Sequence, residues 1–211
     1  TSFIRSPGVR LVAVSGSTSY DSAQQDDDVD FFCVTRKNEM WFFMVKTLLL
    51  ARINRLGHRD EPSVCLSCVM DDGRAIAEFN EAKDPLFARD ALTAKPLHGL
   101  EYFQRLLTRA TWMKNFYPNL YLSKINSKRI NSINSDSGSS AIKRVLNSYL
   151  FHVVGRYIRL KSNLLNRRLA KEGKVSSIFA VRMGEDHCIY ESVRYRQLRE
   201  MYSKLTDRRS A

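Results

Sequence analysis

Two short apolar runs, separated by a polar and acidic stretch, constrain the fold of this chain more than any other feature of its sequence. Residues 9–14 and 29–35 are almost continuously apolar. Runs of this length and composition predict strands of a sheet that is covered on both faces. The connection contains Gly16, and five of the chain's 22 acidic residues lie between residues 14 and 34. The sequence therefore predicts two core strands joined by an acidic loop.

The next segments extend this pattern of apolar runs. Residues 40–56 are apolar at a length that predicts a buried helix, and residues 63–70 predict a third strand. We expect a turn at residues 71–74 and a fourth strand at residues 75–79. Strands that alternate with a helix indicate an α/β or α+β fold, in which at least one helix packs on the sheet.

From residue 86 onward the pattern is mainly helical. We expect a helix at residues 100–113, a Ser/Asn-rich loop at residues 123–140 and a long amphipathic helix at residues 141–174. A late strand at residues 175–183 and a basic helix at residues 190–205 complete the prediction. The apolar stripe of the long helix consists of Ile142, Val145, Leu146, Tyr149, Leu150, Val153, Val154, Tyr157 and Ile158.

The charge of the chain also changes near residue 85. Residues 1–85 carry 10 Lys and Arg against 13 Asp and Glu, whereas residues 86–211 carry 24 against 9, within a net charge of +12. We therefore predict a sheet domain at residues 1–85 and a helical, basic part at residues 86–211. A basic surface is suited to a polyanion such as RNA, and a solvated set of helix faces is the alternative. The candidate polyanion contacts are Arg156, Arg159, Arg167, Arg168 and Lys171.

Composition also bears on where the chain works. Three of the four cysteines lie in apolar, strand-like runs, which favours reduced thiols in the core and a cytoplasmic location. The most apolar window, residues 40–53, is shorter than the roughly 20 residues of a membrane-spanning helix, so no membrane span is expected. The first residues show no secretory leader, and a start at Thr1 leaves room for an upstream element.

The candidate chemistry lies at the ends of the first two strands. Gly16 lacks a side chain and lets a phosphate approach the backbone, and Ser17 adds a hydroxyl. Asp28 and Asp30 are two residues apart on a strand, so their carboxylates share one face, which suits Mg²⁺ shared with substrate phosphates. Lys46 on the predicted helix either reaches a phosphate or extends to solvent. The alternative is an acidic turn that only caps a strand.

This arrangement resembles the polymerase-β-like nucleotidyltransferase superfamily, whose signature is Gly-Ser followed by Asp-hydrophobic-Asp. The segments "VRLVAVSGS", "DDDVDFFCVT", "MWFFMVKTLLL" and "VCLSCV" are similar to those of a bacterial group of uncharacterised nucleotidyltransferase-domain proteins. The segment "LFARDALTAKPLHGLEYFQRLLTRATWMKNFYPN" extends that similarity, which covers roughly residues 8–120. The resemblance implies a small mixed sheet with a largely helical C-terminal part.

The resemblance also implies an activity. It places Gly16 and Ser17 at a triphosphate and Asp28 and Asp30 on one or two Mg²⁺ ions, for transfer of a nucleoside monophosphate from an NTP such as ATP. The acceptor is then a hydroxyl of a protein, an RNA end or a small molecule.

One feature of that superfamily is missing from the sequence. Active members carry a third carboxylate on a later strand, and residues 63–70 contain none. The nearest acids are Asp71, Asp72 and Glu78. The alternative function is therefore a catalytically reduced fold that binds nucleotide or nucleic acid without transfer.

Overall fold

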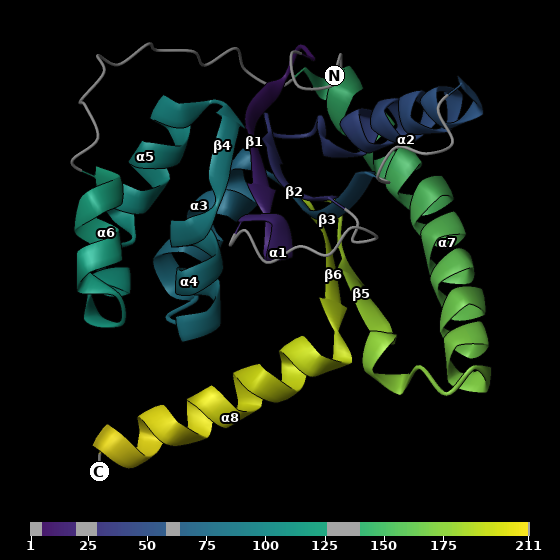
Figure 1. Ribbon diagram of the computed structural model, residues 1–211. Helices are drawn as coiled ribbons and strands as arrows, with labels where there is room; N and C mark the ends of the chain where they lie inside the picture. Colours follow the sequence, from purple (N-terminus) through teal and green to yellow (C-terminus); the bar gives the residue numbers. More distant parts are fainter. Residues whose placement is uncertain (1–5, 20–28, 58–63, 126–139, 211) are drawn as a thin grey trace.

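The structure, a computed structural model, describes residues 6–19, 29–57, 64–125 and 140–210. Its centre is a six-stranded mixed sheet in the order β4-β1-β2-β3-β6-β5, with helices on both faces (Figure 1). The β2–β3 pair is parallel and the other four pairs are antiparallel. The strands are β1 Val9–Ser15, β2 Val29–Thr35, β3 Val64–Asp71, β4 Lys95–His98, β5 Phe179–Met183 and β6 His187–Ser192. The predicted α+β class with a mixed sheet is therefore confirmed.

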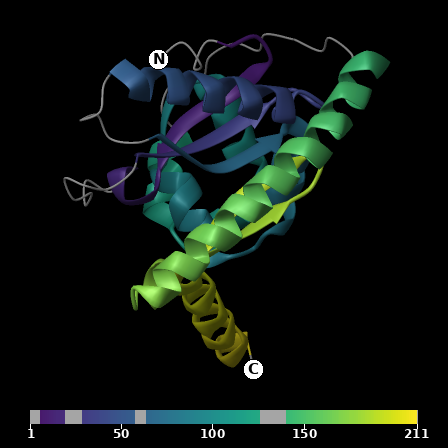
Figure 2. The same cartoon turned by 90° about the vertical axis from the view of Figure 1, so that its right-hand side faces the viewer.

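The helices form two layers around the sheet. The helices α3 to α6 pack on one face, and α2 and α7 pack on the other, where each layer encloses its own apolar core (Figure 1). The last helix, α8, extends away from the lower end of the sheet (Figure 2). The helices are α1 Gly16–Ser19, α2 Met40–Gly57, α3 Asp72–Glu81, α4 Pro85–Thr93, α5 Leu100–Arg109, α6 Pro118–Ile125, α7 Ala141–Lys171 and α8 Val193–Ser210, with 3-10 turns at Thr111–Asn115 and Val175–Ser177.

The predicted fourth strand at residues 75–79 is wrong, because this segment lies inside α3. Asp71 caps α3 by accepting a hydrogen bond from the backbone N–H of Arg74 at 3.0 Å. Ala75 and Phe79 are four residues apart and both buried, so the helix turns them toward one core. The short apolar run is thus one face of a helix and not a strand.

The end of the chain differs in a second way. The predicted late strand is confirmed as β5, although it begins at Phe179. Residues 190–192, which we expected in the last helix, belong instead to β6, and α8 begins only at Val193. β6 pairs with β3 and β5 within the sheet, so tertiary pairing overrides the helical pattern of the residues that follow it.

The sheet also crosses the predicted boundary near residue 85. Strands β4, β5 and β6 come from the basic back part and extend the sheet at both sides of the three N-terminal strands. Residues 123–125 of the predicted loop are the end of α6, and residues 126–139 lie outside the described residues. The front and back parts of the sequence therefore build one sheet together.

Helix α2 covers the central strands. Met40, Trp41 and Met44 are fully buried against the sheet, whereas Leu49 and Ile53 are exposed. Neither α2 nor any other helix within the described ranges is long and apolar enough to cross a membrane.

Helix α7 packs on the same face as α2 through a stripe that includes small and polar residues. Asn147, Gly155, Ile158 and Ser162 are its buried residues, and they recur at helical spacing. The absent side chain at Gly155 brings Met183 Sδ to 3.5 Å from the position that a Cβ would occupy. Most of the apolar stripe predicted from the sequence faces away from the sheet instead.

A buried amide joins α7 to α2 and to the β5–β6 turn. Asn147 accepts a hydrogen bond from the backbone N–H of Trp41 at 3.0 Å and donates one to the carbonyl of Glu185 at 2.9 Å. The Trp41 indole N–H donates to the carbonyl of Gly184 at 3.0 Å. These bonds hold three segments that are distant in sequence.

We expect Asn147→Ala to lower the free energy of unfolding by about 1–3 kcal/mol, because it leaves the buried Trp41 N–H without its acceptor. Ser148→Ala is the matched control, since the Ser148 hydroxyl bonds Glu185 at 2.8 Å at an exposed position. Urea unfolding of both variants checks the prediction, and equal losses for the two would contradict it.

Candidate functional site

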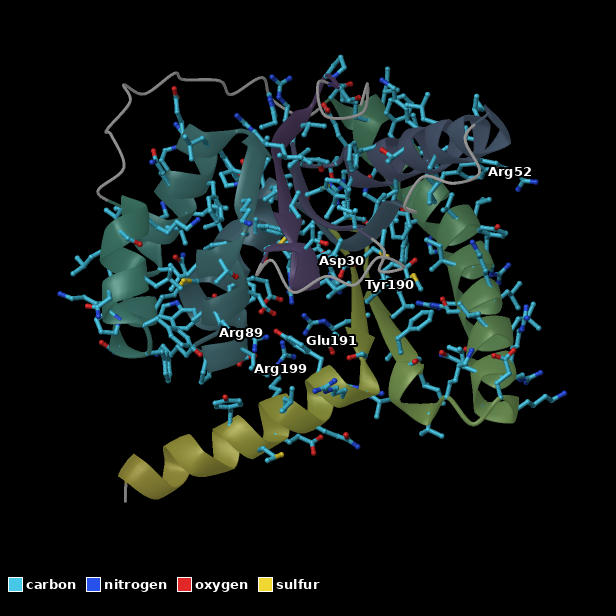
Figure 3. All side chains as sticks on the ribbon, viewed as in Figure 1. Asp30, Arg52, Arg89, Tyr190, Glu191 and Arg199 are labelled. Carbon is cyan, nitrogen blue, oxygen red and sulfur yellow. The ribbon has the colours of Figure 1, made fainter. Side chains whose placement is uncertain are left out.

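A large cavity lies at the end of the sheet where β1 finishes and β2 begins. Its volume is ≈ 1060 Å³, which is at the upper end of the range for small-molecule sites. The tips of β1 and β2, the middle of β3, and parts of α3, α4, α7, β5, β6 and α8 line it. Asp30, Glu191 and Arg199 lie around the space between the sheet and α8 (Figure 3).

Gly16 and Asp30 meet at this cavity. Ser15 pairs with Asp30 across the β1–β2 ladder, and α1 starts at Gly16 directly after it. Gly16 has a φ of +65°, and a Cβ there would lie only 2.5 Å from Asp30 Oδ2. The half-buried Asp30 carboxylate therefore packs directly over the glycine backbone. The structure thus brings together two of the residues that the sequence pattern selected.

The other predicted site residues are distributed differently. The backbone of Ser17 continues α1 next to Gly16, while its side chain and Asp28 lie outside the described residues. Lys46 does not line the cavity, and its ammonium group donates to the Ser6 hydroxyl at 3.0 Å. The structure therefore does not place Lys46 beside Gly16.

Two of the three acids considered as a third carboxylate lie at the opposite end of β3. Asp71 pairs with Thr35, which is five residues or roughly 16 Å along β2 from Asp30. Asp72 accepts a hydrogen bond from the Tyr102 hydroxyl and lies 3.8 Å from Arg10. Both acids serve the start of α3 and its contact with α5.

Four other acids line the cavity with Asp30. Glu78 comes from α3, Asp84 and Asp90 come from the start and the body of α4, and Glu191 comes from β6. Glu191 lies two residues after Ile189 on β6, so the two side chains point to the same face of the sheet. Ile189 packs in the core that contains Phe32. Because Phe32 shares its face of β2 with Asp30, the Glu191 and Asp30 side chains belong to the same face of the sheet.

Arginines pair with each of these four acids, and Arg89 does so with Asp90 at 2.9 Å. Arg182 on β5 lies 3.5 Å from Glu78 and 3.8 Å from Glu191. Arg199 on α8 donates to Glu191 at 3.2 Å and to Asp84, the N-cap of α4, at 2.6 Å. The ion pairs connect α3, α4, β5, β6 and α8 around one side of the cavity, so they join the helix that ends the chain to the sheet.

The cavity side of the sheet is a poor environment for thiolates and phenolates. Burial raises the pKa of the Cys68 thiol, and the nearby Glu78 raises it further. Burial likewise raises the pKa of Tyr195, assisted by Asp90. Both groups are neutral near pH 7, and neither is a candidate nucleophile.

The candidate polyanion contacts all lie on α7. Arg156, Arg159, Arg167, Arg168 and Lys171 are exposed. Arg168 pairs with Glu172 at 2.8 Å at the end of the helix. None of the five lines the cavity, although Lys161 on the same helix does. The basic set is thus a separate surface from the Gly16–Asp30 site.

Within the part of the chain that the structure describes, no three His, Cys, Asp or Glu side chains group as a metal site. Of the two predicted Mg²⁺ ligands, Asp30 lies within the described residues, whereas Asp28 belongs to residues 20–28, which lie outside them. No family model, curated protein or solved structure matches the chain.

Sequence reasoning missed the part of the cavity that β5, β6 and α8 build. Glu191, Arg182 and Arg199 were not selected, because residues 190–192 were assigned to a helix. The signal was present in "HCIYES", where the buried Cys188 is followed by side chains that alternate between the two sheet faces. The strong helical pattern of the following residues concealed it.

The resemblance to nucleotidyltransferases implies that this site binds Mg²⁺–ATP, and on that expectation Gly16→Ala should weaken the binding at least tenfold, because its Cβ would displace the Asp30 carboxylate. Gly173→Ala is the matched control, since Gly173 also has a positive φ of +71° but meets nothing within 4 Å. Both variants should lose roughly 1–2 kcal/mol of folding stability from backbone strain. Titration calorimetry with Mg²⁺–ATP distinguishes them, and equal affinities would contradict the prediction.

A second prediction concerns Asp71. Burial raises its pKa above the ordinary value of 3.8, so the folded state holds the proton more tightly than the unfolded state. The stability from this group is complete below pH 3.8 and is lost as pH rises through the folded pKa. Asp71→Asn retains a cap for α3 without the charge. We therefore expect its stability relative to wild type to increase between pH 4 and pH 7, as measured by urea unfolding.

The control for this series is Glu81→Gln, an exposed acid at the end of α3. It removes a carboxylate from the same helix without touching the cap, so it measures the general effect of a lost acidic charge on stability. A relative stability of Asp71→Asn that falls with pH would show that the ionised carboxylate stabilises the folded state.

Proposed function

We propose that the protein is a Mg²⁺-dependent nucleotidyltransferase that moves a nucleoside monophosphate from an NTP to a hydroxyl acceptor. The observation that carries this proposal is the contact between the Gly16 backbone and the Asp30 carboxylate at a cavity of ≈ 1060 Å³. The glycine offers close backbone approach for a phosphate, and the carboxylate offers a ligand for the cation that accompanies it.

The residues at this point fit Mg²⁺. Asp30 is half-buried at the cavity with its Oδ2 against Gly16, and carboxylate oxygen is the ligand type that Mg²⁺ prefers. Asp28, two residues earlier, would supply the second carboxylate of the pair. A Mg²⁺ ion held there would neutralise charge on the triphosphate and align it for in-line displacement.

The chain's own residues would bind and orient the nucleotide. Gly16 exposes its backbone at the tip of β1, where a phosphate could approach it beside the Asp30 carboxylate. Phe87 lines the cavity, packs on the same side of the sheet as Phe32 and offers apolar surface for a base. Transfer further requires a group that accepts the proton of the acceptor hydroxyl, for which Glu191 is the carboxylate on the Asp30 face of the sheet.

A second candidate function is binding of a nucleotide without transfer. The observation that favours it is the pairing of additional cavity acids with arginines, Glu78 with Arg182 and Glu191 with Arg182 and Arg199. In these ion pairs the guanidinium groups occupy the carboxylate oxygens that a proton-accepting group would need to offer to the acceptor hydroxyl. A site in this state would hold Mg²⁺–NTP but would not remove a proton efficiently.

We expect Mg²⁺–ATP or another Mg²⁺–NTP to raise the melting temperature of the wild-type protein, and Asp30→Asn to abolish the shift, because the variant lacks the carboxylate charge. Glu81→Gln, outside the cavity, should retain the shift. The measurement is a thermal-shift assay with each of the four NTPs, with and without Mg²⁺. A protein that shows no shift with any of them has neither proposed function.

Transfer and binding are then separated with an NTP that carries a radioactive phosphorus in the α-phosphate. Label that becomes attached to an RNA, protein or small-molecule acceptor from cell extract demonstrates transfer, whereas a thermal shift without label transfer supports binding alone. Asp30→Asn serves as the negative control, because any label that it still transfers comes from another enzyme in the extract.

A further inference from the structure

Helix α7 has two apolar faces, and only one of them is covered. Its inner face packs on the sheet through Ile158 and the small residues Gly155 and Ser162. A second set of large apolar side chains on the same helix is between 41% and 77% exposed. The members of this outer stripe are Ile142, Val145, Leu146, Tyr149, Val153, Tyr157, Leu160, Leu164 and Leu165.

The outer stripe points directly away from the protein body. At about 100° per residue, all its members except Leu165 fall within an arc of about 120°, centred opposite the buried stripe. Figure 2 shows α7 along the face nearest the viewer with the sheet behind it. A helix that is apolar on both sides is normally enclosed, so an exposed stripe of this size marks a contact surface.

The stripe is also straight. Its central members are Ile142, Leu146, Tyr149, Val153, Tyr157, Leu160 and Leu164. They follow steps of four, three and four residues twice, an 11-residue repeat of about 3.7 residues per turn. This repeat keeps the side chains in line along a straight helix for about 33 Å, whereas the heptad repeat of a left-handed coiled coil would drift around it.

The charges of α7 all have one sign. Its 31 residues contain eight Lys and Arg and no Asp or Glu. At about 100° per residue, Lys143, Lys161 and Arg168 border the outer stripe on one side and Arg159 borders it on the other, while Arg156, Arg167 and Lys171 lie within the arc. Lys143 is paired with Glu39 at 2.6 Å and Arg168 with Glu172 at 2.8 Å, so most of the charge on this side comes from the other five residues. Basic side chains therefore lie along the boundaries between the covered face of α7 and its exposed apolar face.

We propose that the outer face of α7 binds the surface of an anionic lipid membrane, with the helix lying in the plane of the interface. A straight apolar stripe with basic margins and two tyrosines is the form of a helix that inserts shallowly among lipid headgroups. The charge of α7 favours an anionic membrane as the binding partner, because anionic headgroups complement a helix that contains no acidic residue. This inference does not rest on the proposed nucleotidyltransferase activity.

Charge disfavours a second copy of the chain as the occupant, since two α7 helices face to face would bring two sets of arginines and lysines together, among them Arg156, Arg159 and Arg167. RNA complements the charge but offers no apolar surface for the eight outward-facing side chains. An anionic membrane satisfies both the apolar and the charged components of the surface.

The test is flotation of the full chain with vesicles of phosphatidylcholine containing roughly 30 mol % phosphatidylserine, compared with pure phosphatidylcholine. We expect binding to the anionic vesicles and at least tenfold weaker binding to the neutral ones. The double variant Val153→Asp/Leu160→Asp should lose at least tenfold in binding to the anionic vesicles. The matched control Leu97→Asp/Leu122→Asp changes two exposed leucines outside α7 and should bind like wild type.

A second variant tests the positive charges of this face and keeps every apolar side chain of the stripe. Arg156→Glu/Arg159→Glu should weaken binding to anionic vesicles at least tenfold and leave binding to neutral vesicles unchanged. Because both positions are exposed, this variant also keeps the test valid if the aspartate variant fails to fold. Circular dichroism confirms the fold of each variant.

Three results would overturn the proposal. In one, the stripe variant binds anionic vesicles as well as wild type does. In another, the wild-type chain binds no vesicles and instead forms a dimer in sedimentation that the stripe variant loses, which assigns the face to a second copy. In the third, it binds no vesicles but binds a single-stranded RNA in a salt-sensitive way that only the arginine variant weakens.

Discussion

The pairing of β6 with the outer edge of β3 is the contact on which the arrangement of this protein depends. Without it, β3 would end the sheet with unpaired backbone groups, which is an unfavourable edge for a strand in the core. The pairing brings Glu191 and, through β5, Arg182 onto the same side of the sheet as Asp30. It also sets the starting point of α8, whose Arg199 reaches back to Glu191 and Asp84.

This pairing has a consequence for chemistry. The N-terminal half supplies Gly16 and Asp30 near the ends of the antiparallel strands β1 and β2. The C-terminal half supplies a charged wall of the same cavity, which consists of Arg182, Glu191 and Arg199. In that wall, Arg182 from β5 and Arg199 from α8 both form ion pairs with Glu191. The ion pairing of Glu191 therefore depends on the position of α8. Arg199 thereby connects α8 both to Glu191 on the sheet and to Asp84 at the start of α4.

Helix α7 illustrates a different constraint. A helix usually satisfies its hydrophobic pattern by burying one stripe, and the natural expectation is that the largest apolar residues form it. Here the packed stripe contains Asn147, Gly155 and Ser162, since a close approach to the sheet and to α2 requires small side chains and one buried amide. The larger residues are left on the outside, where together with a uniformly basic charge they form a second surface.

The amino-acid pattern alone was sufficient for the central strands, for α2, for the existence of α7 and for Gly16 beside Asp30, because these depend on local periodicity and on the pairing of strands that follow one another in the chain. Periodicity could not distinguish the helix at Ala75–Phe79 from a strand, since the cap by Asp71 decides it. Nor could it identify β6, the arginine-paired Glu191 or the outward direction of the α7 stripe. Each of these features depends on which segments of the chain become neighbours in space. Contacts between residues more than 100 positions apart, such as Trp41 and Asn147, decide this, and they exist only in the folded chain.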